Sequence, residues 1–177
     1  MTEQPTHGIS RAWAMPSPQT FSIKPIRELL QRWLPTDPTK IVDPFCGDTE
    51  WAGVRNDLMR DRVEANDFLD TLIAHEEKWA DAVLLDPPYS PRQIVECYKK
   101  VGLSVSNTTS QNARLYKEAI DRLDRLLKPG GIAIRCGWNS VGFGKSRGYR
   151  LEEVLIVCHG GAHNDTIITV ERKGDHR

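Results

Sequence analysis

Residues 80–89 read ADAVLLDPPY, and this stretch organises the rest of the chain. Apart from Asp81, its first six residues are apolar, which is typical of a strand buried on both faces of a sheet. Two prolines follow Asp86, and the strand must end there because proline has no backbone N–H to donate to a neighbouring strand. The stretch therefore predicts a buried strand with a carboxylate at its carboxyl end.

Strand-like and helix-like segments alternate on both sides of this stretch. Apolar residues at three- and four-residue spacing indicate helices at 24–34, about 68–79, 91–100 and 112–127. Short apolar runs predict further strands at 40–45, 53–58, 62–69 and 131–138, and residues 152–173 predict two strands around a turn at Gly160 and Gly161. This order predicts an α/β fold with a mostly parallel sheet and a C-terminal antiparallel hairpin.

The length of 177 residues suits one domain. Residues 1–19 are polar and contain prolines, so we expect an irregular N-terminal arm followed by a single domain over residues 20–177. The sequence shows neither a signal-peptide pattern nor an apolar run long enough for a bilayer, and we expect a cytoplasmic protein without membrane contact. None of the four cysteines belongs to a C-x-x-C pair, and no metal site is expected.

Basic and acidic residues are equal in number, at 24 each, which excludes a polybasic protein that coats nucleic acid. The charges are nevertheless unevenly distributed along the chain. Residues 90–117 and 137–150 carry net charges of +4 and +3, whereas residues 46–70 carry −4. The sequence thus predicts an acidic side and a basic side, and a basic side suits a nucleic acid.

The tetrapeptide DPPY at the end of the predicted strand suits the methylation of an exocyclic amine. The lone pair of an aromatic amine is delocalised into its ring, which makes the amine a poor nucleophile. The Asp86 carboxylate and the Pro87 carbonyl can accept both amine protons and so localise the lone pair toward an incoming methyl group. Tyr89 offers a face on which a base can stack. Taken alone, the same four residues also suit a simple strand-ending turn.

Other candidate ligand-binding residues follow the neighbouring predicted strands. The run 43–47, DPFCG, ends the strand at 40–45, and a glycine just after a first strand lets a ligand approach the backbone closely. Asp57 and Asp67 end the next two predicted strands, where an acidic residue commonly binds ribose hydroxyls in nucleotide-binding sheets. The chain lacks G-x-G-x-x-G after its first such strand, which argues against a nicotinamide-binding domain.

Together these motifs resemble those of S-adenosylmethionine-dependent amino-methyltransferases of the DNA adenine-N6 type. FSIKPIRELL (21–30) resembles the family's N-terminal cofactor motif, DPFCGD (43–48) its first-strand motif, NDFL (66–69) its adenine-contacting segment and DPPY (86–89) its catalytic motif. The resemblance covers roughly residues 20–171. The chain looks most similar to small orphan methylases of phages and other mobile elements, which share the sequence segments DPPYSPRQ and HNDTI. It implies a Rossmann-like methyltransferase fold, S-adenosylmethionine as cofactor and, for a phage protein, the host cytoplasm.

The resemblance also implies a role for each matching residue. Phe21 and Lys24 would lie near the methionine end of the cofactor, Asp57 at the ribose and Asp67 at the adenine. The implied cofactor-binding set is Phe21, Lys24, Asp43, Pro44, Phe45, Cys46, Gly47, Asp57, Asp67 and Phe68. The implied catalytic set, which would hold the target amine, is Asp86, Pro87, Pro88 and Tyr89.

The chain departs from the family pattern after its first strand. The family usually continues DPFCGSGT into a full helix, whereas Gly47 is followed here by DTE at residues 48–50. Only residues 46–52 separate the two predicted strands, while a parallel crossover usually needs about 10–12 residues. We therefore expect the first connecting helix to be reduced to a turn, which makes Asp57 the least secure of the cofactor assignments.

A second departure concerns substrate recognition. Only 88 residues follow DPPY, too few for a separate target-recognition domain beside the rest of the sheet. Substrate contacts are therefore expected from Arg92, Trp138, Lys145 and Arg147. The expected partner is DNA, and a homodimer would enlarge the binding surface. The motif also suits RNA or the N4 amine of cytosine, and a catalytically silent cofactor-binding subunit is an alternative of a different class.

Overall fold

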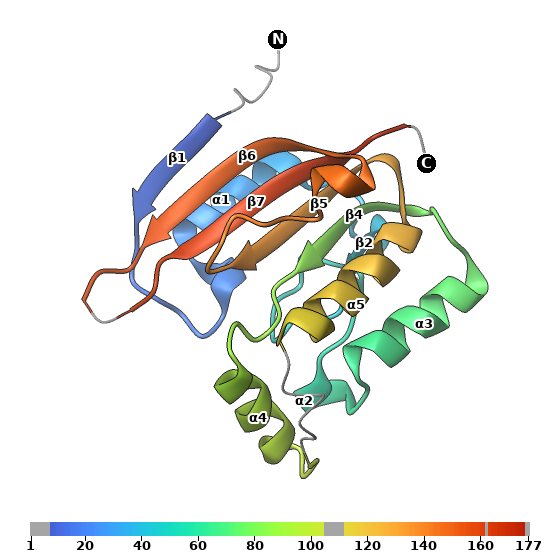
Figure 1. Cartoon of the computed structure of the whole chain (residues 1–177), viewed down its shortest axis with the longest axis horizontal. Coiled ribbons are helices and arrows are strands. Elements are labelled where there is room, and N and C mark those ends of the chain that lie inside the picture. Colours follow the sequence, from blue (N-terminus) through green and yellow to red (C-terminus); the bar gives the residue numbers. More distant parts are fainter. Residues whose placement is uncertain (1–7, 105–111, 162, 176–177) are drawn as a thin grey trace.

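The computed structural model describes residues 8–104, 112–161 and 163–175, and their strands form one seven-stranded sheet. Across the sheet the strands lie in the order β1-β6-β7-β5-β4-β2-β3 (Figure 1). Their bounds are β1 Gly8–Trp13, β2 Ile41–Asp43, β3 Val54–Arg55, β4 Ala80–Leu85, β5 Leu127–Gly137, β6 Tyr149–Cys158 and β7 Thr166–Lys173.

The sheet is mostly parallel. Strand β7 runs antiparallel to both of its neighbours, β5 and β6, and every other neighbouring pair of strands is parallel. The predicted α/β, Rossmann-like fold with a C-terminal antiparallel hairpin is confirmed. Because β1, β2, β4, β5 and β6 all point the same way, their carboxyl ends share one edge of the sheet.

Helices cover both faces of this sheet (Figure 1). Their bounds are α1 Lys24–Trp33, α2 Leu58–Asp61, α3 Ala65–His75, α4 Pro91–Lys100 and α5 Asn112–Leu126. On β4, Ala82 and Leu84 belong to the core cluster that includes α1, while Val83 and Leu85 belong to the one that includes α3 and α5. Each large apolar side chain buried in this way contributes about 1.5–3 kcal/mol. No helix in the described part of the chain is long and apolar enough to cross a bilayer.

The helix α4 begins immediately after the DPPY motif, and its start is fixed by a capping box. The Ser90 hydroxyl accepts a hydrogen bond from the Gln93 backbone N–H at 3.2 Å, and the Gln93 side chain accepts one from the Ser90 backbone N–H at 3.1 Å. The same Gln93 oxygen accepts the backbone N–H of Tyr89 at 2.6 Å. Because such caps stabilise a helix start by about 0.5–2 kcal/mol, the chain that follows β4 has one defined path.

The N-terminal segment corrects one expectation. Residues 8–13 form strand β1 rather than part of an irregular arm, and they pair in parallel with β6, with Gly8 opposite Glu153 and Trp13 opposite Cys158. Five of the six residues of β1 are exposed, and only Ala12 is half-buried. An edge strand held mainly by backbone hydrogen bonds needs no alternating apolar pattern, so the sequence carried no strand signal here.

A second expectation is wrong for residues 62–69, which do not form a strand. Residues 65–75 form helix α3, and Glu64 is its N-cap. Its inner side is made by Ala65, Leu69 and Leu72, which recur at helical spacing and pack against the core. Strand β3 is therefore the edge of the sheet on this side, and the NDFL segment lies in the first turns of a helix.

The expected loss of the first connecting helix is confirmed. Residues 44–53 between β2 and β3 form turns. The Asn56 backbone N–H donates to the Asp43 carbonyl at 2.9 Å, and the Cys46 N–H donates to the Asn56 carbonyl at 3.0 Å. These two hydrogen bonds fold the connection back on itself, so that Asp57 comes to lie beside Gly47.

The loop after β5 is held by a buried carboxylate on β7. Glu171 is 5% exposed and accepts hydrogen bonds from the backbone N–H groups of Phe143 and Gly144. A Cβ at position 142 would overlap the Oε2 atom of Glu171. Glycine is therefore required at position 142 by close approach.

We expect Gly142→Ala to lower the free energy of unfolding by about 1–3 kcal/mol, because the methyl group must displace a carboxylate that caps two backbone N–H groups. Denaturant unfolding measures this difference. Gly137→Ala is the matched control, since a Cβ there meets its nearest atom at an ordinary 3.5 Å. Equal stability of the two variants would show that Glu171 does not fix the loop.

Candidate active site

The polar motifs meet where the order of the strands reverses. From β2 the chain moves outward to β3 and then crosses back to β4 on the other side of β2. In an open parallel sheet, ligands bind in the crevice outside the carboxyl ends of the strands at such a switch point. A cavity of about 710 Å³ lies here, lined by the residues that follow β2 and β4. Its size is typical of a site for a small molecule or cofactor.

Most of the residues predicted for the site reach this cavity. The DPFCG and DPPY motifs, which lie far apart in the sequence, line it together with the 3₁₀ turn η1 (Thr20–Ser22). The predicted residues that line the cavity are Phe21, Pro44, Phe45, Cys46, Gly47, Asp57, Asp86, Pro87, Pro88 and Tyr89. The folded chain thus brings ten predicted residues to one place.

Asp86 lies at the cavity wall directly after β4. Its Oδ1 accepts a hydrogen bond from the Tyr89 hydroxyl, which lies 3.4 Å from Oγ1 of Thr20. Burial raises the pKa of Asp86 to about 6, and hydrogen bonds from Tyr89 and Thr20 oppose this rise. The carboxylate is therefore mostly ionised at neutral pH, and it can exchange the Tyr89 hydroxyl for another hydrogen-bond donor.

The backbone of the DPPY motif is held from outside the cavity. The Tyr116 hydroxyl on α5 donates to the Pro88 carbonyl at 3.1 Å. Behind it the Arg135 guanidinium on β5 lies 5.2 Å from the centre of the Tyr116 ring, and Arg135 is 7% exposed. Two elements distant in sequence thus fix the position of the second proline.

Trp138 borders the motif without lining the cavity. It follows β5 and is 43% exposed. Its ring meets that of Tyr89 edge-on, with the ring centres 5.7 Å apart and an angle of 62° between the planes. The predicted substrate residue Trp138 is therefore adjacent to the predicted catalytic motif.

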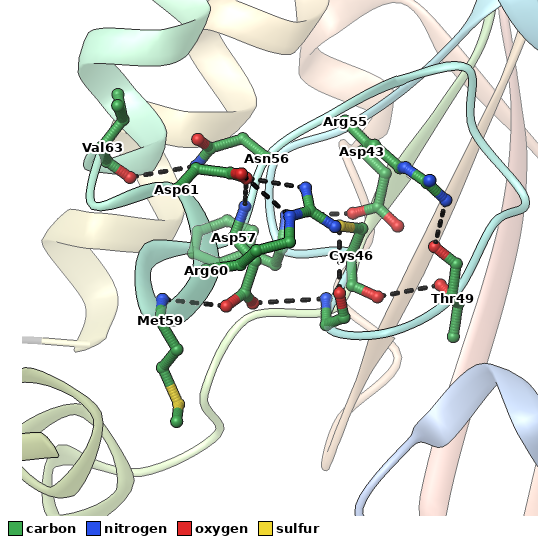
Figure 2. A network of polar contacts seen from close by, with 12 residues as sticks. Asp43, Cys46, Thr49, Arg55, Asn56, Asp57, Met59, Arg60, Asp61 and Val63 are labelled. Atoms are coloured by element: carbon green, nitrogen blue, oxygen red, sulfur yellow. Dashed lines mark hydrogen bonds and ion pairs between the residues drawn. The ribbon is translucent and has the colours of Figure 1, made fainter. Parts of the chain in front are cut away.

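The cavity floor is a network of hydrogen bonds around Asp57 (Figure 2). Asp57 accepts the Gly47 backbone N–H at 3.2 Å through Oδ2 and the Met59 N–H at 2.9 Å through Oδ1. Gly47 has a φ of +53°, a left-handed conformation that favours glycine, and nothing lies within 4 Å of a Cβ built there. The turn after β2 thus keeps backbone, rather than side chain, exposed to the cavity.

Asp43 ends β2 beneath this floor. Its side chain is fully buried; Oδ1 accepts the Phe45 N–H at 3.0 Å, and Oδ2 has no hydrogen-bond partner among the described residues. Burial, with a smaller contribution from the negative charges of Asp86 and Asp57, raises its pKa to about 8, although the hydrogen bond from the Phe45 N–H opposes this rise. A buried carboxylate with an unused oxygen is costly to the fold, which is typical of a functional position.

Several residues predicted to bind the cofactor lie elsewhere. The Lys24 side chain is 77% exposed and lies 4.0 Å from Glu28. Asp67 is exposed on α3, and Phe68 packs against the hydrophobic core. Because α3 begins at Ala65, the residues that reach the cavity are those of its first turn, Glu64, Ala65 and Asn66. Of the NDFL segment, only Asn66 lines the cavity.

The basic residues predicted to contact substrate also lie outside the cavity. Arg92 pairs with Glu96 at 2.8 Å, and Arg147 pairs with Asp121 at 2.7 Å and donates to the Phe143 carbonyl at 3.0 Å. Lys145 is exposed at the start of the 3₁₀ turn η3 (Lys145–Arg147). Both arginines therefore have a carboxylate partner within the chain. Because Asp121 lies outside residues 137–150, the net charge of +3 overstates the charge that this segment offers to a ligand.

The cavity also contains residues that the sequence analysis did not select. Thr20 hydrogen-bonds with Tyr89, and the side chain of Gln19 donates to Asp48 at 2.9 Å; Thr20, Gln19 and Asp48 all line the cavity. The charged lining residues are Asp48, Asp57, Arg60, Glu64, Asp86, Glu96 and Lys100. Five of these seven are acidic, so the cavity favours a cationic ligand. The acidic excess of residues 46–70 was the sequence signal for this property.

Comparisons with known proteins found structural likeness only. No protein-family model and no curated protein sequence matched the chain. A proposed methyltransferase, yhhF from Escherichia coli, is 14% identical, with 90% of this chain and 92% of that chain covered and a TM-score of 0.46. The N-methyltransferase NodS from Bradyrhizobium japonicum WM9 is 11% identical over 93% of this chain and 74% of that chain, with a TM-score of 0.38. A third structure, PH0851, is 14% identical over 92% of this chain but only 36% of its own, with a TM-score of 0.42. Likeness at this level does not determine what this chain does.

Proposed function

We propose that the chain transfers a methyl group from S-adenosylmethionine to the N6 amine of adenine in DNA. The observation that carries the proposal is the position of Asp86, a largely ionised carboxylate at the carboxyl end of β4, facing a cavity at the switch point of the sheet. The adjoining prolines present a rigid backbone to the same cavity. The four residues DPPY also match the catalytic motif of the amino-methyltransferases that the sequence resembles.

The cavity suits the proposed cofactor in charge and in size. S-adenosylmethionine bears a sulfonium and an ammonium against one carboxylate, and five of the seven charged residues that line the cavity are acidic. Asp43 lies buried beneath the floor, and with a pKa of about 8 its carboxyl would become ionised only when a cationic group lies close by. When bound, the cofactor supplies an electrophilic methyl group.

Particular residues would hold the two ends of the nucleoside. Asp57 accepts two backbone N–H groups and retains lone pairs that can accept ribose hydroxyls. The first turn of α3, with Glu64 and Asn66, offers polar groups for the adenine. This assignment replaces Asp67 and Phe68 with residues that precede them by one to four positions.

The residues of the motif would activate the target amine. An Asp86 oxygen would accept a hydrogen bond from one amine N–H once the Tyr89 hydroxyl has been displaced, and the Pro87 carbonyl would accept one from the second amine N–H. The Pro88 carbonyl is unsuited to this role because Tyr116 already donates to it. With both protons held, the nitrogen lone pair is directed away from the ring toward the methyl donor.

We expect kcat/KM for methyl transfer to fall as the pH falls through about 6. The pKa of Asp86 is raised to about 6, and its protonated form cannot accept the amine proton. The rate at pH 5 should therefore be about tenfold below the plateau above pH 7, since about a tenth of the carboxyl groups are then ionised. A pH–rate profile of the wild-type protein tests this. A profile that is flat between pH 5 and 8 would contradict the assigned role of Asp86.

We expect Asp57→Ala to weaken S-adenosylmethionine binding about tenfold or more, because it removes a ribose acceptor together with the support of Gly47. Asp67→Ala is the matched control, since Asp67 is exposed on α3 and does not line the cavity. Calorimetric titration compares the two variants. A greater loss of affinity in Asp67→Ala would contradict this assignment and support Asp67 as the adenine-binding residue.

The proposed function is tested with methyl-labelled S-adenosylmethionine and separate preparations of duplex DNA, single-stranded DNA and RNA. Label transferred to DNA supports the proposal. Label transferred only to RNA, or to no nucleic acid, contradicts it.

A further inference from the structure

Exposed aromatic residues lie on the carboxyl edge of the sheet, beyond the cavity. Trp138 follows β5, and Trp13 ends the edge strand β1; their side chains are 43% and 71% exposed. Met15, two residues after Trp13, is 81% exposed. Because β1, β5 and β4 are parallel members of one sheet, all of these residues lie at the edge that also bears Asp86.

The position of Trp13 is well defined despite its exposure. A Cβ built on Gly160, in the turn between β6 and β7, would lie 3.2 Å from Cζ3 of Trp13, so the indole rests against this turn. The Arg11 guanidinium lies 6.0 Å from the centre of the indole and donates to the Cys158 sulfur at 2.8 Å. Trp13 is therefore braced on two sides while its remaining surface stays open to solvent.

The chain between Trp13 and the cavity runs along the same edge. The Ala14 N–H donates to the Cys158 carbonyl at 3.2 Å, and the Ala14 carbonyl accepts a hydrogen bond from Nδ1 of the His159 ring at 2.9 Å. From there the chain reaches Thr20, which lines the cavity and contacts Tyr89. Trp13 and the active site are thus the two ends of one continuous segment.

The spacing of the strands sets the distance between these two ends. Strand β1 is four positions from β4 in the sheet, and neighbouring strands lie about 4.8 Å apart, which gives about 19 Å. Trp138 is next to the start of this path, and Trp13 is at its end. A distance of this order spans several nucleotides of an extended strand.

Helices cover only part of this side of the molecule. In Figure 1, α3 and α5 lie in front of the half of the sheet that contains β2 and β4, whereas none of the described helices lies in front of β1. Ala12 and Ala14 pack toward the core cluster that includes α1. Since successive residues of a strand point to opposite faces, Arg11 and Trp13 point to the uncovered face.

We propose that Trp13, Met15 and Trp138 form a stacking platform for the unpaired DNA strand that flanks the target base. Exposed aromatic rings supply stacking surfaces for bases of any sequence, and Arg11 adds a cation beside Trp13. The inference rests on the proposed function and assigns it single-stranded DNA as the preferred substrate. It replaces the basic residues of segments 90–117 and 137–150 as the main substrate contacts.

The platform is tested with Trp13→Ala and two oligodeoxynucleotides, one of about 12 nucleotides and one of about three, each with a single adenine among thymines. We expect the variant to raise the Kd and KM for the long strand about 5- to 150-fold, the range that stacking of one base provides. Values for the short strand should be unchanged, because it cannot reach from Asp86 to Trp13.

Trp79→Ala is the matched control. Trp79 also lies against a cation, with Lys40 Nζ 5.8 Å from the ring centre, but it precedes β4 at the opposite edge of the sheet. Trp79→Ala should leave the affinity for both oligodeoxynucleotides unchanged at temperatures where the variant is folded. Thermal unfolding of both variants verifies that they are folded.

Equal losses for the long and short strands, or no loss for either, would overturn the platform. The same holds if Trp13→Ala dissociates a dimer in sedimentation without changing DNA affinity, since a second copy would then occupy the edge. Binding measured by fluorescence anisotropy keeps the two proposals separable. Absence of methyl transfer, with binding to the long strand that depends on Trp13, would contradict the proposed function and retain the platform.

Discussion

Replacing Asp86 with alanine should lower methyl transfer about 1000-fold and leave S-adenosylmethionine binding nearly unchanged. Removing a group that accepts a proton in the transition state typically costs about 10²–10⁴ in rate. Asp86 also hydrogen-bonds with Tyr89, so the alanine variant frees that hydroxyl as well. Single-turnover methyl transfer and calorimetric titration of the cofactor separate the two effects.

Two variants sharpen this experiment. Asp86→Asn keeps the volume of the side chain but replaces one acceptor oxygen with a donor, and it should be as inactive as the alanine variant. Tyr89→Phe removes the hydroxyl that competes for Asp86 Oδ1 and should lose far less activity. If Asp86→Ala retained activity near that of the wild type, or lost cofactor affinity in proportion to its rate, Asp86 would not be the group that holds the amine.

Replacing Asp43 with asparagine should stabilise the protein without cofactor at pH 8, by an amount on the order of 2–5 kcal/mol. Burial raises the pKa of this carboxyl to about 8 in the folded protein, against an ordinary value near 4. The folded state therefore binds a proton more tightly than the unfolded state does. The bound proton therefore contributes fully to the free energy of unfolding below about pH 4, and this contribution is lost as the pH rises toward 8.

Denaturant unfolding at several pH values measures this effect. The stability of the wild type should decline between about pH 4 and 8 relative to that of Asp43→Asn, so the two curves diverge as the pH rises. Asp67→Asn, at an exposed position on α3, is the control and should follow the wild type. Parallel curves for Asp43→Asn and the wild type would mean that the Asp43 carboxylate has a partner in solution. Loss of S-adenosylmethionine affinity in the stabilised variant would connect the cost of this carboxylate with ligand binding.

The sequence predicted the parts of the fold that are controlled by burial and by chain termination. Strand β4 was evident because both of its faces are buried, which leaves a continuous apolar run before Pro87. Helix α1 has Pro25 in its first turn and Pro35 beyond its end, and three of its residues are fully buried on one side. The reduced connection after β2 followed from its length alone.

The sequence failed where tertiary contacts decided the structure. Strand β1 has exposed side chains and owes its existence to backbone pairing with β6, a partner more than a hundred residues away. Residues 62–69 combine apolar and polar residues in a way that suits either a strand or a helix, and packing of Leu69 against α5 favours the helix.

The candidate site shows the same division. Its motifs could be predicted from the sequence because proline, glycine and aspartate have distinctive chemistry at strand ends. Ten of the predicted residues line one cavity. The basic residues predicted to contact substrate lie outside this cavity, and the pairing of Arg147 with Asp121 could not be predicted because it joins segments that meet only in the folded chain. Trp13 lies within the segment that the sequence predicted to be an irregular arm, and its position beside Gly160 depends on the pairing of β1 with β6.

The most direct test of the central claim is to identify the methylated nucleoside. Single-stranded DNA is incubated with the wild-type protein and S-adenosylmethionine, digested to nucleosides and analysed by mass spectrometry, with Asp86→Ala as the blank. We predict N6-methyldeoxyadenosine as the product with the wild type and none above background with the variant. Methylated deoxycytidine in its place, or no methylated nucleoside with the wild type, would contradict the account.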